Sequence, residues 1–184
     1  MKAMEGIRTA KETDAEEILR IYAPIITETP ISFEYALPSI AEISTRIADT
    51  LTQYPWLVCE QQGRVVGYAY ARAYRARAAY QWSAEVSVYV DSEFYGKGIG
   101  KTLYRALFAI LRQQGYRTVI GGITLPNAAS VGIHESLGFK PAGVFKALGY
   151  KLGAWHDVGF WQLDLQPSTI DPVPPVPFSL LKRA

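Results

Sequence analysis

VSVYVDSEFYGKGIGK, residues 86–101, is the segment that decides the fold of this chain. Its first five residues are mostly β-branched or aromatic, which favours a buried strand. Three glycines follow, and a helical pattern then runs from Gly98 to Gln114 and stops at Gly115. A glycine-rich turn between a strand and a helix presents unpaired backbone N–H groups at the helix N-terminus. The segment therefore predicts a phosphate-binding turn, with a ligand-free turn as the structural alternative.

Two common phosphate-binding loops do not fit this turn. A Walker loop ends in the Gly-Lys-Thr found at residues 100–102, but it requires a glycine at the position of Tyr95. The dinucleotide fingerprint fits Gly96 and Gly98 but requires a third glycine where Lys101 stands, and no early strand precedes it. Neither pattern therefore identifies the phosphate.

The turn resembles instead the pyrophosphate loop of GNAT superfamily N-acetyltransferases, whose pattern is Q/R-x-x-G-x-G/A. Residues 95–100, YGKGIG, match that pattern at Gly98 and Gly100, and Tyr95 replaces the usual Gln or Arg. Residues 127–139, NAASVGIHESLGF, resemble a second family pattern, N-x-x-A/S…E-x-x-G-F. In the family the loop binds the pyrophosphate of acetyl-coenzyme A, and the second segment holds its pantetheine arm. The resemblance therefore implies acetyl-coenzyme A (acetyl-CoA) as the acetyl donor.

A narrower resemblance points to the phosphinothricin N-acetyltransferases and covers about residues 6 to 166. It is carried by residues 54–58 (YPWLV), 76–90 (ARAAYQWSAEVSVYV), 149–151 (GYK) and 155–162 (WHDVGFWQ). Related enzymes of this group accept methionine sulfoximine or methionine sulfone. The resemblance implies a homodimeric enzyme that acetylates the α-amino group of a small amino-acid analogue. The alternatives are an acetyltransferase for another small amine or a protein N-terminus, and a non-catalytic acyl-CoA sensor, which Tyr95 favours.

The length of 184 residues favours one domain. The resemblance implies an α/β fold (α+β by some schemes) with a mixed central sheet flanked by helices. We expect this GNAT domain to span residues 1–165. Residues 166–184 form a proline-rich tail, since residues 166–177 hold five prolines. The tail is expected to lie over its own surface or a partner subunit, and a ligand for a proline-binding module is the alternative.

The hydrophobic pattern predicts an alternation of strands and helices. Capping boxes are expected at Thr13–Glu16 and at Ser39–Glu42, and a loop with three prolines is expected over residues 24–38. Strands are expected over residues 7–10, 56–60, 65–74, 84–90, 119–123, 144–150 and 157–165, and the later helices over residues 98–114 and 127–137.

Charge and cysteine content narrow the functional classes. The net charge is +2, so nothing in the sequence demands nucleic acid or an anionic membrane as a partner. Cys59 is the only cysteine, which indicates a reducing compartment. No apolar run predicts a signal peptide or a membrane span, so a cytoplasmic protein is expected. The two histidines and the cysteine are dispersed, which argues against a metal site.

Glu85 is the candidate general base. On the expected strand, Glu85, Ser87 and Tyr89 share one face, and three valines share the other. A carboxylate within such an apolar strand is costly unless it is paired or used, and general-base catalysis is one such use. The matching glutamate of the phosphinothricin group is the proposed base, and a base has no purpose in a sensor. An ion pair with Arg75 or Arg77 is the structural alternative.

His134 is the candidate acid, because an imidazolium can protonate the leaving thiolate. Many family members carry a tyrosine at this position. A packing or coenzyme-contacting role is the alternative, since a coenzyme A thiol is already a fair leaving group. The resemblance places the oxyanion donor among the backbone N–H groups of Val88 to Val90, where the strand of the family parts from its neighbour. His156 is expected to be structural.

The resemblance assigns two further groups of residues. The coenzyme-binding candidates are Val88, Tyr89, Val90, Gly96, Lys97, Gly98, Ile99, Gly100, Lys101, Asn127 and Ser136. The substrate-binding candidates are Phe33, Tyr35, Arg75, Arg77 and Tyr80, because arginines recognise oxyanions and aromatic side chains can wall the pocket. A basic and aromatic segment also suits single-stranded nucleic acid, but the near-zero net charge and the short extent argue against that partner.

Overall fold

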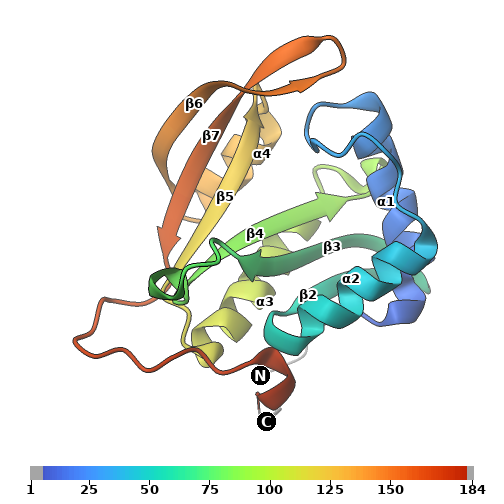
Figure 1. The fold of residues 1–184 in the computed structure, drawn as a ribbon. Coiled ribbons are helices and arrows are strands. Elements are labelled where there is room, and N and C mark those ends of the chain that lie inside the picture. Colours follow the sequence, from blue (N-terminus) through green and yellow to red (C-terminus); the bar gives the residue numbers. More distant parts are fainter. Residues whose placement is uncertain (1–5, 182–184) are drawn as a thin grey trace.

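The computed structural model describes residues 6–181 of the chain. Its centre is a seven-stranded sheet in the order β1-β2-β3-β4-β5-β7-β6 (Figure 1). The strands are β1 (Ile7–Thr9), β2 (Trp56–Gln61), β3 (Arg64–Ala73), β4 (Ser83–Val90), β5 (Thr118–Leu125), β6 (Lys140–Lys151) and β7 (Ala154–Asp164). The helices are α1 (Ala15–Glu28), α2 (Ile40–Gln53), α3 (Ile99–Gln114) and α4 (Ala128–Ser136). The predicted single α/β domain with a mixed sheet is confirmed, because β4 and β5 pair in parallel and the other neighbouring pairs are antiparallel.

Helices cover both faces of the sheet. Neighbouring side chains of a strand point to opposite faces, so Leu57 of β2 belongs to the core beneath α3 and Val58 to the core beneath α1 and α2. The buried stripe of α3 includes Leu103 and Leu107, which are four residues apart and therefore share one helix face. Figure 1 shows α1 and α2 together on one face and α3 on the other.

The parallel pair of strands separates early. β4 pairs with β5 at three positions only, and the last of them joins Glu85 to Ile120. Both strands continue beyond that position, β4 to Val90 and β5 to Leu125. β4 keeps its pairing with β3 from Ala84 to Val90, whereas β5 continues with β7. The sheet is therefore forked between β4 and β5 (Figure 1). The fork opens directly after Glu85.

The start of α1 differs from the prediction. The capping box at Ser39–Glu42 is confirmed, because Ser39 Oγ accepts a bond from Glu42 N at 3.2 Å and Glu42 Oε2 accepts one from Ser39 N at 2.6 Å. The box predicted at Thr13–Glu16 is wrong: α1 begins after Asp14, whose side chain makes no capping bond. Arg8 donates to both oxygens of that carboxylate at 2.7 and 2.8 Å. The same carboxylate accepts a bond from Lys11 N–H at 2.7 Å, so it closes the turn before α1 and does not cap α1 itself.

The predicted loop over residues 24–38 is also too long at its start, because Pro24 lies inside α1. Proline removes one hydrogen bond from a helix interior and usually breaks it. Here the buried stripe of Ile18, Ile21, Tyr22 and Ile26 continues past the proline and holds the helix against the sheet. Packing therefore outweighs local propensity. The other expected strands and helices are found, with ends that shift by a few residues.

The proline-rich segment lies against its own chain. Trp82 Nε1 donates to the carbonyl of Val173 at 2.9 Å, and the backbone N–H of Val176 donates to the carbonyl of Gln114 at 2.8 Å. The buried side chain of Gln114 returns a bond to the carbonyl of Val176 at 2.8 Å. Ser179 then bonds to the end of α2. The division at residue 165 stays a prediction, and residues 1–5 and 182–184 of the two predicted parts lie outside the described residues.

The carboxylate of Asp91 closes β4 and links it to two other elements. Its side chain is 7% exposed, and Oδ2 accepts bonds from Arg20 of α1 and Arg64 of β3. Burial alone would raise the pKa of Asp91, but the hydrogen bonds from Arg20 and from Glu93 N–H, with the charges of both arginines, hold that pKa below its ordinary 3.8. The stabilisation is therefore complete above pH 3.8 and is lost as the pH falls through the lowered pKa.

We predict that Asp91→Asn lowers the free energy of unfolding by about 2–3 kcal/mol at neutral pH, because two arginines lose their buried anion. The difference from the wild type should shrink towards about pH 3. Urea unfolding at both pH values measures this. Glu93→Gln is the control, since that side chain is 67% exposed and pairs with Arg64 alone, and its expected loss is below about 1 kcal/mol. Equal losses in the two variants would contradict the prediction.

Candidate active site

A cleft lies where β4 and β5 part. Its walls come from β4, β5, α3, α4 and the loop after α1. They comprise Ile31, Val86, Ser87, Val88, Tyr89, Tyr104, Gly122, Ile123, Thr124, Asn127, Ser130 and His134. Past Glu85, the edge of β4 that faces β5 has no strand partner among the described residues. Backbone groups at that edge are therefore available to a ligand in the cleft.

The glycine loop leads from β4 into α3. Gly96 and Gly98 have φ angles of +75° and +79°, which favour glycine, and Gly98 precedes the first turn of α3. Gly100 lies in that turn, where an added Cβ would stand 2.9 Å from Ile133 Cδ1 of α4. The glycines therefore let the chain turn and let α3 approach α4. The first N–H groups of α3 have no partner within the helix and form an anion site with the helix dipole.

The other coenzyme candidates are not all at the cleft. Asn127 lines it and caps α4, because its Oδ1 accepts a bond from Ser130 N at 3.0 Å. Ser136 lies at the opposite end of α4, and its hydroxyl donates to the carbonyl of Ile133 at 2.9 Å. Lys97 is exposed and places Nζ 4.4 Å from the ring centroid of Phe94. Of these three residues, Asn127 lines the cleft and can contact a ligand there, whereas Ser136 and Lys97 do not line it.

Glu85 stands at the fork itself. Arg72 lies directly across from it on β3, and Arg72 Nη2 donates to Glu85 Oε1 at 2.7 Å. The ion pair with Arg75 or Arg77 that the sequence offered as an alternative is not the one found. The carboxylate also faces β5, because a Cβ added to Gly122 would stand 4.0 Å from Glu85 Oε1. Glu85 is therefore placed between an arginine and the cleft.

His134 is buried at 3% exposure within the cleft wall. Its Nδ1 lies 2.7 Å from the carbonyl oxygen of Ser130, so Nδ1 carries a proton and donates it there. Nε2 is then free to accept a hydrogen bond from the hydroxyl of Tyr104 at 3.2 Å. Burial lowers the pKa of His134 from its ordinary 6.5, against the bond to Ser130, which raises it. This environment favours the neutral ring.

Tyr104 is a site residue that the sequence did not reveal. It occupies the buried face of α3, where its spacing predicts an ordinary core residue. In the fold its hydroxyl reaches His134, and the side chain lines the cleft. Only the tertiary arrangement of α3 and α4 brings the two residues together.

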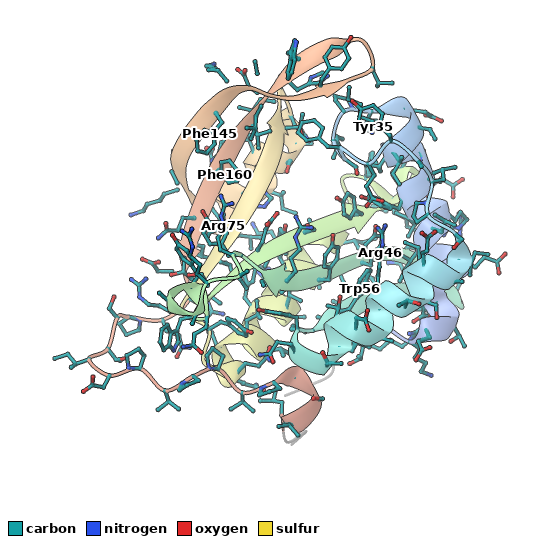
Figure 2. All side chains as sticks on the ribbon, in the orientation of Figure 1. Tyr35, Arg46, Trp56, Arg75, Phe145 and Phe160 are labelled. Carbon is teal, nitrogen blue, oxygen red and sulfur yellow. The ribbon has the colours of Figure 1, made fainter. Side chains whose placement is uncertain are left out.

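The substrate candidates form two groups. Phe33 and Tyr35 lie in the loop between α1 and α2 and contact the β6–β7 hairpin. Figure 2 shows Tyr35 at this place. The hydroxyl of Tyr35 donates to the carbonyl of Tyr150, and the ring of Phe33 fills the space above Gly149. Arg75, Arg77 and Tyr80 are exposed on the connection between β3 and β4. None of these five residues belongs to the walls of the cleft.

A second cavity, of about 330 Å³, lies between the α1–α2 layer and the sheet. Its walls comprise Ile18, Tyr22, Glu34, Ile43, Arg46, Thr50, Trp56, Tyr68, Tyr70 and Arg72. Arg46 and Trp56 lie on this side of the sheet in Figure 2. Residues 6–181 contain no cluster of three histidine, cysteine or acidic residues able to hold a metal ion. In the same range no helix has the length and apolar character needed to cross a membrane.

Comparison with known proteins agrees with this geometry. Residues 7–159 match the model of the acetyltransferase (GNAT) domain family. The chain is 40% identical to phosphinothricin N-acetyltransferase of Streptomyces viridochromogenes, over 92% of this chain and 93% of that protein. It is 34% identical to L-methionine sulfoximine/L-methionine sulfone acetyltransferase of Pseudomonas aeruginosa, over 91% and 98%.

A solved structure is similar along nearly the whole chain. It is a GNAT superfamily phosphinothricin acetyltransferase from Sinorhizobium meliloti in complex with acetyl-CoA. The TM-score is 0.85 at 34% sequence identity, and the match covers 94% of this chain and 97% of that one. The fold of this chain is therefore that of a known structure in the GNAT superfamily.

The surroundings of His134 lead to a test of its charge. We predict that its ring titrates with a midpoint below 6.5, because burial disfavours the imidazolium. Proton NMR of the ring resonances across a pH series measures this, and His134→Gln assigns the signal by its disappearance. A midpoint at or above 6.5 would contradict the buried, neutral ring.

Proposed function

The chain belongs to the GNAT acetyltransferase family and is an acetyl-CoA-dependent N-acetyltransferase, and we propose that its acceptor is the α-amino group of a small amino-acid analogue. L-Phosphinothricin and L-methionine sulfoximine or sulfone are the leading candidates, because enzymes with these acceptors are the relatives described above. The observation that carries the proposal is the placement of Glu85 at the fork, between Arg72 and the cleft.

The described residues fit acetyl-CoA as the donor. The N-terminus of α3, with Gly96, Gly98 and Gly100 before or within its first turn, suits the pyrophosphate. The free edge of β4 at Val88–Val90 offers backbone N–H groups to the carbonyl oxygen of the thioester as it gains charge. Tyr89 and Asn127 line the same cleft. We assign Lys97, Ile99, Lys101 and Ser136 to the coenzyme as well, on the resemblance of their segments.

Glu85 acts as the general base in this proposal. An amine whose pKa lies two units above the ambient pH is mostly protonated. Forming the reactive free amine then costs about 2.7 kcal/mol. An ammonium group loses two protons on its way to an amide. One passes to the solvent to give the free amine, and the Glu85 carboxylate takes the other as the nitrogen bonds to the acetyl carbon and the carbon–sulfur bond breaks. Coenzyme A leaves as the thiolate and the product is an amide. The bond from Arg72 holds the carboxylate in place for this step.

His134 has a smaller part in the proposed reaction. The neutral ring has no proton to give from Nε2, and its Nδ1 proton is engaged with Ser130. A minor imidazolium form is the species that can act as the acid. We propose that the chief role of His134 is to hold the hydroxyl of Tyr104 at the wall of the cleft.

The resemblance of their segments assigns the acceptor to two groups of residues. Phe33 and Tyr35 contact the β6–β7 hairpin. Arg75, Arg77 and Tyr80 supply cations and an aromatic surface from the connection between β3 and β4. We propose a cytoplasmic location, which suits a chain with one free, buried thiol at Cys59.

The experiment that tests the acceptor is release of coenzyme A, followed with a thiol reagent. The panel contains L-phosphinothricin, methionine sulfoximine, methionine sulfone, the standard amino acids, polyamines and a peptide with a free N-terminus. Turnover confined to the first three supports the proposal. Turnover of the peptide or a polyamine alone would show that this compound is the acceptor and would contradict the proposal. Tight coenzyme binding without turnover would favour a sensor.

Glu85→Gln tests the base. We expect kcat/KM to fall by about 10²–10⁴, because the glutamine cannot accept the amine proton. The acidic limb of the pH–rate profile should change, while the dissociation constant of acetyl-CoA stays the same. Steady-state kinetics and calorimetry measure these quantities. An unchanged rate and profile would show that another group is the base.

We propose that the protein is a homodimer through the β6–β7 hairpin. β6 is the edge strand of the sheet, and it exposes Phe145 at 57% and Leu148 at 53%, beside Trp155 of β7 at 66%. An exposed apolar edge of this length favours association with a second chain.

Leu148→Glu should convert the dimer to a monomer, because the charge would be buried in the interface. Light scattering after size-exclusion chromatography measures the mass, and circular dichroism confirms the fold. Lys140→Glu, at the start of the same strand, is the control and should remain dimeric. A wild-type monomer, or a dimeric Leu148→Glu protein, would place the interface elsewhere.

A further inference from the structure

Glu85 lies between two cavities. On one side Gly122, which lines the cleft between β4 and β5, faces its carboxylate. On the other side Arg72 bonds to it, and Arg72 lines the cavity beneath α1 and α2. Arg72 and Glu85 sit opposite each other on neighbouring strands, so their side chains share one face of the sheet. Glu85 itself is in the wall of neither cavity, but it lies beside one residue that lines each of them.

The charged side chains of the second cavity differ in how many of their hydrogen-bonding groups have partners. Glu34 accepts two bonds from Arg46, at 2.8 and 3.1 Å, and one from the hydroxyl of Tyr22 at 3.0 Å. That cation and that anion therefore neutralise each other. Arg72 makes one side-chain hydrogen bond within the described residues, the bond to Glu85, and its side chain is 57% exposed. A guanidinium has five N–H donors, so most of those on Arg72 remain available to a ligand.

The rest of the lining suits a short, partly apolar chain. Trp56, Tyr68 and Tyr70 stack along the floor of the cavity, with ring centroids of Trp56 and Tyr70 4.4 Å apart. The volume of about 330 Å³ is near the lower limit for a small-molecule site. It admits a molecule of amino-acid size and is too small for several residues of a peptide.

We propose that this cavity receives the side chain of the acceptor, and that Arg72 binds the anionic end of that side chain and so determines specificity. The inference rests on the proposed function, since it extends the acceptor site around Glu85. The expected acceptor has an amine that lies beside Glu85. A few bonds away it carries an oxyanion that accepts hydrogen bonds from the free donors of Arg72. A phosphinate or a carboxylate has this chemistry, whereas a sulfone has a similar shape without the charge.

The first test compares two acceptors of similar shape. For Arg72→Met we expect kcat/KM for L-phosphinothricin to fall about 10- to 100-fold more than for L-methionine sulfone, because the anion loses a charge-assisted bond. The KM of acetyl-CoA should stay unchanged. Arg72→Lys should restore part of the preference for L-phosphinothricin over L-methionine sulfone, since it keeps the charge but loses the planar donor pair. An effect transmitted through Glu85 alone would lower kcat/KM equally for both acceptors. That result would overturn the proposal.

The second test fills the cavity without touching Arg72 or Glu85. Thr50→Phe, on the wall formed by α2, should raise the KM of both acceptors at least about tenfold and leave the KM of acetyl-CoA unchanged. Thr45→Phe, on the exposed face of the same helix, is the matched control. Normal acceptor KM values in Thr50→Phe, with the folded state confirmed by circular dichroism, would overturn the proposal.

Two outcomes separate this inference from the proposed function. If the wild type acetylates neither acceptor, the proposed function fails and this inference fails with it. The other outcome is a wild type that acetylates L-phosphinothricin, with a preference for the anion that Arg75→Met or Arg77→Met removes and Arg72→Met does not. In that case only this inference fails. Recognition would then belong to the connection between β3 and β4.

Discussion

The short parallel pairing of β4 and β5 is the constraint on which the site depends. It ends at Glu85 and Ile120, and the two strands then follow different neighbours. Buried backbone N–H and C=O groups need partners, so an unpaired strand edge inside the protein calls for a ligand that supplies them. The pantetheine arm of coenzyme A carries amide groups that can do so. In the proposed reaction the fork thus holds the acetyl donor, and the last paired residue, Glu85, stands where the fork opens.

The parts of the fold that depend on local sequence were predictable. Gly98 and Gly115 bound α3, because both have positive φ angles that favour glycine, and Ser39 caps α2 through bonds within four residues. The failures came where contacts outside a helical pattern override that pattern. Asp14 is bonded to Arg8 and to Lys11 N–H rather than to the first turn of α1, and Pro24 is kept inside α1 by the apolar face around it. The residue pattern of the helix alone does not reveal either effect.

The candidate site was predictable to a smaller degree. Motifs gave the glycine loop and Asn127, and strand alternation put Glu85 on a single face. The partner of Glu85 depends on the register of β3 against β4, which pairs it with Arg72 and not with Arg75 or Arg77 three and five residues later. Likewise, Tyr104 meets His134 only because α3 and α4 approach each other at Gly100. Register and helix contact are tertiary properties, so spacing along the chain did not reveal these two residues.

The proposed role of Arg72 also links recognition to chemistry. One of its N–H groups bonds to Glu85, and most of its other donors are available to a ligand. An anionic acceptor bound to those donors is therefore held by the same guanidinium that holds the base. The amine of the acceptor then reaches Glu85 only when its distance from the anionic group matches the distance from Arg72 to the carboxylate. A neutral acceptor lacks this anchor, so the ion pair that positions the base also selects the substrate.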